Sequence, residues 1–192
     1  MSTLATLVTQ LRKDFRRHHS SLGAPTVWAV AVYRFGVWGK ELQNPIIKTV
    51  ASKAYGAMFL GVQLATGIVI NREARIGSDF YLIHHGNTKI HPGVVIGEGC
   101  AIMHDVTIGT NMERPGAPRL GNDVFVGAGA KILGPITIGD GARIAANSLV
   151  ISDVPAGTTA IGVPARILQY TGRPVPSAAP SASAEATAAS KS

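Results

Sequence analysis

The sequence predicts a mainly β protein: a parallel β-helix that follows an N-terminal helical region and precedes a disordered C-terminal tail. Three patterns predict this order. Large aliphatic residues recur at every sixth position in the middle of the chain, apolar residues recur at helical spacing before it, and an Ala/Ser/Pro-rich segment follows it. The composition agrees, because 22 glycines among 192 residues with 6% aromatic residues favour short strands and many turns.

The first segment, residues 1–66, is expected to be helical. Its first helix carries an apolar stripe at three- and four-residue spacing, formed by Leu4, Leu7, Leu11 and Phe15. Basic residues flank this stripe, so it either packs on the next helices or makes a peripheral contact with a membrane or a neighbouring protein. Two more apolar helices are expected over Trp28–Trp38 and Ile46–Leu64, separated by Gly and Pro breaks.

The second segment, residues 67–170, contains the six-residue repeat, which predicts a coil with three flat sides. Its strictest run is Leu120, Val126, Ile132, Ile138, Ile144 and Val150. A period of six matches neither the α-helix nor simple strand alternation. It fits turns of about eighteen residues, with one large side chain pointing inward from each side and neighbouring turns paired as parallel strands. The third segment, residues 171–192, cannot bury enough apolar surface to fold, so we expect a disordered tail.

Small or β-branched residues occupy a second inward position, four residues after each large one. The single cysteine, Cys100, falls at this position, which predicts a buried thiol rather than a reactive one. One cysteine also excludes a disulfide framework and a CxxC site.

Two irregularities interrupt the repeat, and functional residues are expected there. The step from Leu82 to Ile90 has eight residues and contains His84 and His85. In the segment 109–119, the position at which the repeat requires an apolar anchor is occupied by Arg114. This segment is therefore predicted to be a loop that projects from the coil.

The register places certain side chains on adjacent coils. Leu82 and Ile102 lie one complete turn apart, so His84 is expected to stack on His104, and His85 on Asp105. An imidazole beside a carboxylate is a plausible oriented base. The remaining histidines, His18, His19 and His91, are expected to be solvated polar side chains.

These motifs resemble the hexapeptide-repeat acyltransferases, in particular serine acetyltransferase and its relatives in polysaccharide gene clusters. The resemblance covers Ile70 to Leu168 and rests on RIGSDFYLIHHG, VVIGEG, VFVGAGAKILGPITIGDGARI and DVPAGTTAIGVPARIL. It implies a left-handed β-helix, homotrimers and acetyl-CoA as the acetyl donor.

The resemblance also implies roles for individual residues. The catalytic histidine of the family maps onto His84, with His85 as the second choice. The supporting aspartate maps onto Val69, which leaves Asp105 as the candidate orienting carboxylate. The implied donor-binding residues are Gly109, Thr110, Ala128, Ala146 and Arg166.

The predicted function is an acetyl-CoA-dependent O-acetyltransferase that transfers acetyl directly, without an acyl-enzyme, to a hydroxyl of serine or of a sugar. The alternative is a non-catalytic β-helix scaffold or regulatory trimer. The family's Arg-His pair, which contacts the acceptor, is replaced by Gly116 and Ala117, and this favours a sugar over serine. The histidines lack zinc-site spacing, so no metal is expected.

The chain has a net charge of +7, but its basic residues are not interleaved with aromatic residues, so no nucleic-acid partner is expected. The sequence shows no signal peptide and no long uninterrupted apolar run, which predicts a cytoplasmic protein.

Overall fold

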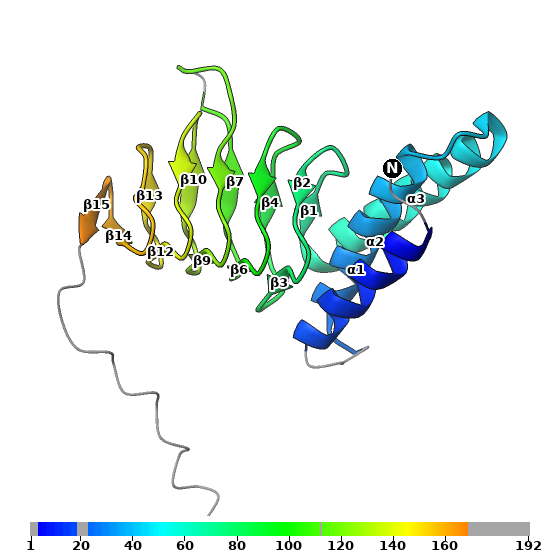
Figure 1. The fold of residues 1–192 in the computed structure, drawn as a ribbon, viewed down its shortest axis with the longest axis horizontal. Coiled ribbons are helices and arrows are strands. Elements are labelled where there is room, and N and C mark those ends of the chain that lie inside the picture. The colour runs from blue at the N-terminus through cyan, green and yellow to red at the C-terminus, as the bar shows by residue number, and fades with distance from the viewer. Residues whose placement is uncertain (1–3, 19–22, 112, 169–192) are drawn as a thin grey trace, which may run out of the picture.

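The protein consists of three helices followed by a parallel β-helix with three flat faces (Figure 1). The computed structural model describes residues 4–18, 23–111 and 113–168. The mainly β fold and its helical N-terminal region are therefore confirmed. The predicted disordered tail, residues 171–192, lies outside the described residues. None of the described helices combines the length and the hydropathy required to span a bilayer.

Each face of the β-helix is a sheet of very short parallel strands, one from each coil. The first sheet contains β1 (Val69–Ile70), β4 (Lys89–Ile90), β7 (Thr107–Gly109), β10 (Lys131–Leu133) and β13 (Leu149–Val150). The second contains β2 (Arg75–Ile76), β5 (Val95–Ile96), β8 (Arg119–Leu120) and β11 (Thr137–Ile138). The third contains β3 (Tyr81–Leu82), β6 (Ala101–Ile102), β9 (Phe125–Val126), β12 (Arg143–Ile144), β14 (Thr159–Gly162) and the antiparallel β15 (Ala165–Leu168).

The interior of the β-helix is built from the two inward positions that the sequence predicts. All six residues of the strict run are buried, and all of them belong to the one continuous core. The small position is buried as well, and Cys100 has no exposed surface there. Burial raises the pKa of the Cys100 thiol to about 11, so the side chain behaves as a small apolar core residue.

The helices are α1 (Leu4–Arg17), α2 (Pro25–Lys40) and α3 (Pro45–Thr66). The ends of α3 are defined by local chemistry. The Asn44 side chain accepts hydrogen bonds from the backbone N–H groups of Ile46 and Ile47, and Pro45 is the first helical residue. Gly67 ends the helix in the left-handed conformation, with φ of 71°, which glycine adopts without strain.

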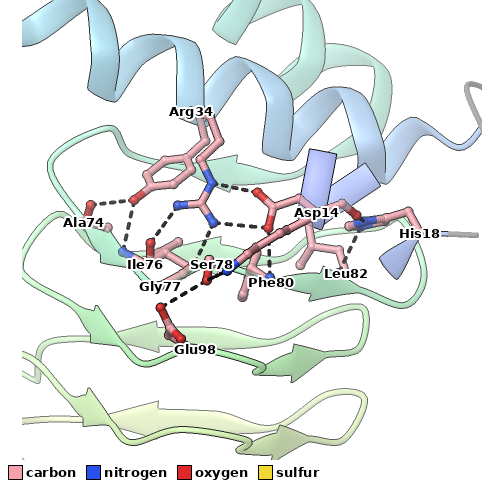
Figure 2. Close-up of polar contacts among 12 residues, drawn as sticks. Asp14, His18, Arg34, Ala74, Ile76, Gly77, Ser78, Phe80, Leu82 and Glu98 are labelled. Atoms are coloured by element: carbon pink, nitrogen blue, oxygen red, sulfur yellow. Dashed lines mark hydrogen bonds and ion pairs between the residues drawn. The ribbon is translucent and has the colours of Figure 1, made fainter. Parts of the chain in front are cut away.

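A buried ion pair attaches α1 and α2 to the first coil of the β-helix (Figure 2). Arg34 Nε donates to Asp14 Oδ2 over 2.7 Å, and both side chains are almost fully buried. The guanidinium also donates to the carbonyls of Ile76 and Gly77, while Asp14 Oδ1 accepts from the backbone N–H of Phe80. These bonds satisfy backbone groups at the edge of the coil, which has no further coil to pair with on that side.

His18 and Tyr33 extend this network, and His18 corrects a prediction. It is buried rather than solvated, with 4% of its surface exposed. Its Nδ1 lies 2.7 Å from the carbonyl oxygen of Asp14, and its Nε2 accepts from the backbone N–H of Leu82. Such contacts require the neutral imidazole with its proton on Nδ1. The Tyr33 hydroxyl donates to the Ala74 carbonyl and accepts from the N–H of Ile76. His19 lies outside the described residues.

Candidate active site

The candidate site follows one outer edge of the β-helix, where the third sheet turns into the first. Strands β3, β6, β9, β12 and β14 pair in register, so residues at the same offset stack on successive coils. The position two residues after each buried anchor is occupied in turn by His84, His104, Ala128, Ala146 and Gly162. We call this set the edge column. It contains three of the residues that the resemblance singled out.

The predicted stacking of His84 on His104 is present. The two ring centroids lie 5.7 Å apart with an interplanar angle of 59°, and both side chains are exposed. The irregular segment that carries His84 is fixed to the next coil. The buried Thr88 hydroxyl lies 3.2 Å from the carbonyl oxygens of Gly86 and Met103, and the Gly86 carbonyl accepts from the N–H of Asp105. The two extra residues therefore form a defined turn that presents an imidazole to solvent.

Asp105 lies one coil from His85, as the register predicts, but its carboxylate points to a different partner. Lys131 Nζ lies 3.4 Å from Asp105 Oδ1 and donates to the Asp105 carbonyl over 2.5 Å. Within the described residues, neither His84 nor His85 has a hydrogen bond to a carboxylate. Asp105 also fills a left-handed turn position, with φ of 55°, which Gly129 and Asn147 fill on the next coils. This backbone role accounts for its residue type.

Gly109 and Thr110, which are predicted to bind the acetyl donor, lie where strand β7 ends and the projecting loop begins. This is the edge of the first sheet opposite the edge column. A shallow groove beside them is lined in part by His91, Thr107 and Leu133. Thr110 lies six positions after His104, so no more than about 20 Å of strand separates the edge column from this groove.

The loop between β7 and β8 projects from the β-helix, as predicted (Figure 1). Arg114 ties it to the coils, because its guanidinium donates to the Ile151 carbonyl over 2.8 Å. Within the loop, the backbone N–H of Arg114 donates to Asn111 Oδ1 over 2.9 Å. The loop therefore rests against the residue that follows β13.

Arg166 lies on β15, in the antiparallel hairpin that closes the C-terminal end of the β-helix. It is exposed and pairs with Ile161, next to Gly162 at the end of the edge column. His84 and Arg166 thus mark the two ends of one outer edge.

His104 is the residue of this site that the sequence analysis did not select. The available signal was its offset from Ile102, which equals that of His84 from Leu82. In the described part of the chain, no three His, Cys, Asp or Glu side chains come close enough together to hold a metal ion.

Comparison with known proteins agrees with this architecture. A family model described as bacterial transferase hexapeptide (six repeats) matches residues 117–152. Serine acetyltransferase of Mycobacterium tuberculosis is 32% identical over 168 residues, which cover 84% of this chain and 73% of that protein. Serine acetyltransferase of Synechococcus elongatus is 34% identical over 150 residues, or 77% of this chain and 59% of that protein. The solved structure of soybean serine acetyltransferase complexed with serine covers 85% of this chain and 70% of that chain, with 28% identity and a TM-score of 0.73.

The six-residue repeat and the matching family model define a hexapeptide-repeat protein of the bacterial transferase type. Within that class, the chain belongs to the serine acetyltransferase family. It spans about three fifths of the length of several curated relatives, such as those from Synechococcus elongatus and Helicobacter pylori, at 59% and 61%.

Proposed function

We propose that this protein is an acetyl-CoA-dependent O-acetyltransferase with His84 as its general base. The observation that carries the proposal is the edge column, in which an exposed imidazole is followed, beyond His104, by small side chains along one edge. The family supports the same chemistry, because the relatives compared above are serine acetyltransferases.

The proposed reaction is a direct transfer. His84 in its neutral form removes the proton of the acceptor hydroxyl while the oxygen attacks the thioester carbonyl of acetyl-CoA. The C–S bond then breaks, the acetyl group remains on the acceptor oxygen, and the imidazolium returns its proton to the departing thiolate. No acyl-enzyme forms, so the chain needs no nucleophile. The lone thiol is buried and its pKa is raised to about 11, which fits this scheme.

The donor is proposed to bind along the edge column. Ala128 and Ala146 stack on adjacent coils, where the Ala128 carbonyl accepts from the N–H of Asn147. Methyl side chains leave the backbone accessible to a pantetheine arm. Arg166 at the C-terminal end supplies a cation for the CoA phosphates. Gly109 and Thr110, at the start of the projecting loop, are proposed to contact the same acetyl-CoA molecule. The homotrimer and the cytoplasmic location remain predictions.

For the acceptor, the site favours a sugar hydroxyl over serine. A serine carboxylate requires a cation or strong donors. The matching positions Gly116 and Ala117 offer neither, and the Arg114 guanidinium already donates to the Ile151 carbonyl. A neutral sugar needs no such partner. Removing charge-assisted bonds to the carboxylate should reduce serine turnover by about 100-fold or more relative to an enzyme that makes them.

The experiment is a CoA-release assay with acetyl-CoA and a panel of acceptors that contains serine and neutral sugars. We expect weak release with serine and faster release with a glycosyl acceptor. A serine kcat/KM above about 10⁴ M⁻¹s⁻¹, typical of good enzymes, would overturn the acceptor assignment. No release with any acceptor, from a protein that is folded, would favour the scaffold alternative.

A further inference from the structure

Helix α3 exposes an apolar face along its whole length. Its inner face packs on α2 and includes the buried Ala51 and Tyr55. Six large apolar side chains on its other sides are exposed by 39–78%: Ile46, Ile47, Val50, Met58, Leu60 and Leu64. We call these six residues the α3 face. A set of large apolar side chains exposed on one helix marks a contact with another molecule or with a membrane.

The charge around the α3 face has one sign. Helix α3 carries Lys48 and Lys53, both exposed, and no acidic residue. The wider segment 1–66 has eight Lys and Arg against two Asp and Glu, a surplus of six positive charges, whereas the whole chain has +7. The helical third of the molecule therefore holds nearly all of the net charge.

The stripe on α1, for which the sequence predicts either packing on the next helices or a membrane contact, packs in part against α2. Leu7 is buried, and Leu11 and Phe15 are half-buried between α1 and α2. Only Leu4 of that stripe is largely exposed, at 61%. Val8 and Trp28, which line a groove between α1 and α2, are also exposed, at 39% and 53%, but the α3 face holds the larger number of exposed apolar side chains.

Two other occupants fit the α3 face less well. The C-terminal segment 169–192 contains one Val and no Leu, Ile, Met or Phe, so it offers little apolar surface to cover the α3 face. A contact between α3 and the α3 of a second copy would leave the lysines without a partner, because this helix offers no carboxylate. An anionic lipid surface satisfies both features, since apolar side chains enter the boundary of the acyl chains while lysines meet lipid phosphates.

We propose that the α3 face binds peripherally to an anionic lipid bilayer. The helix lies in the plane of the membrane surface, with Leu60 and Leu64 inserted and Lys53, which lies on the same side of α3, at the headgroups. This inference is independent of the acetyltransferase assignment.

The test is co-sedimentation of the full chain with vesicles of phosphatidylcholine, either alone or mixed with phosphatidylglycerol. We expect binding to the anionic vesicles and little to the neutral ones. The Leu60→Gln/Leu64→Gln variant, which keeps good helix formers, should bind at least about tenfold more weakly. Lys53→Gln should weaken binding about fivefold. Lys48→Gln, on the opposite side of α3, should weaken it less. The matched control, Leu4→Gln on α1, removes an equally exposed leucine and should bind as the parent does.

Two results would overturn the proposal. Equal binding to neutral and anionic vesicles, or no binding to either, would exclude the anionic surface. A fall in molar mass of the Leu60→Gln/Leu64→Gln variant by light scattering, without loss of vesicle binding, would identify the α3 face as a contact between copies of this chain. Far-ultraviolet circular dichroism checks that each variant retains its helices.

Discussion

The helical end and the middle coils of this protein are held together by different physics. In the coils, the same aliphatic positions and the same backbone pairings repeat, so each coil is stabilised by its neighbours. At the helical end, α2 adds Ala29, Val30 and Tyr33 to the same core, and one buried ion pair with a few side-chain bonds fixes α1 and α2 to the first coil. The coils therefore distribute their stability over many equal contacts, whereas the polar contacts of the helical end are few and unequal.

This difference predicts how each region responds to a small change. A methyl group removed from one coil leaves its neighbours intact and costs only its own contacts. One charge removed from the helical end leaves the opposite charge buried without compensation, which costs more than the pair contributed.

The largest effect on stability is expected at the buried ion pair. Asp14→Asn keeps the shape of the side chain but leaves the Arg34 guanidinium without its counter-charge, with both side chains about 4% exposed or less. We expect the free energy of unfolding to fall by about 3–5 kcal/mol, measured by urea denaturation.

A second ion pair provides the control. Asp79 pairs with Arg17 over 2.7 Å, but these side chains are 40% and 34% exposed. Asp79→Asn should cost less than about 1 kcal/mol, and asparagine also tolerates the left-handed backbone at this position. Equal losses for the two variants would show that burial of the Asp14–Arg34 pair does not matter.

An intermediate effect is expected inside a middle coil. Ile132 is fully buried on β10, between coils on both sides. Ile132→Val removes one methylene and should lower the free energy of unfolding by about 0.5–1.5 kcal/mol. A loss as large as that of Asp14→Asn would contradict the distributed stability of the coils.

At neutral pH the smallest effect is expected at Cys100, because the contribution of this thiol appears only at alkaline pH. Burial raises the pKa of this thiol from 9.0 to about 11. Below the lower value both states keep the proton, so stability does not depend on this group. Between the two values the unfolded chain releases the proton and the folded chain keeps it, so stability falls as the pH rises.

Urea denaturation across this pH range measures the effect. The Cys100→Ala variant should lack the part of the slope that the parent shows between pH 9.0 and about 11. Identical slopes for the two proteins would mean that the thiol is not protected by the core.

The coils could be predicted from the sequence because their pattern is local. The period of six and the size of each side chain are features of a single coil, and they are sufficient to predict which residues face inward. Examples are the anchors from Leu120 to Val150 and the small residue Cys100. The helical end could not be predicted in this way. His18 was expected to be solvated, yet it accepts from the N–H of Leu82, 64 residues away, and no local pattern encodes that pairing.

In the candidate site, too, the stacking of side chains could be predicted from the sequence, but the direction of the Asp105 side chain could not. The offsets from Leu82 and Ile102 were sufficient to bring His84 and His104 together, because stacking follows from register alone. The direction of the Asp105 side chain was not predictable, since it depends on Lys131, whose long side chain reaches it from the neighbouring coil.

The most direct test of the central proposal is the rate of CoA release by His84→Ala, compared with His85→Ala, using the best acceptor of the panel. Loss of a general base predicts that kcat/KM falls by about 100-fold or more for His84→Ala, with an unchanged fold by circular dichroism and unchanged molar mass. His85→Ala should retain most of the activity. Full activity of a folded His84→Ala variant would contradict the proposal and assign the base to another residue.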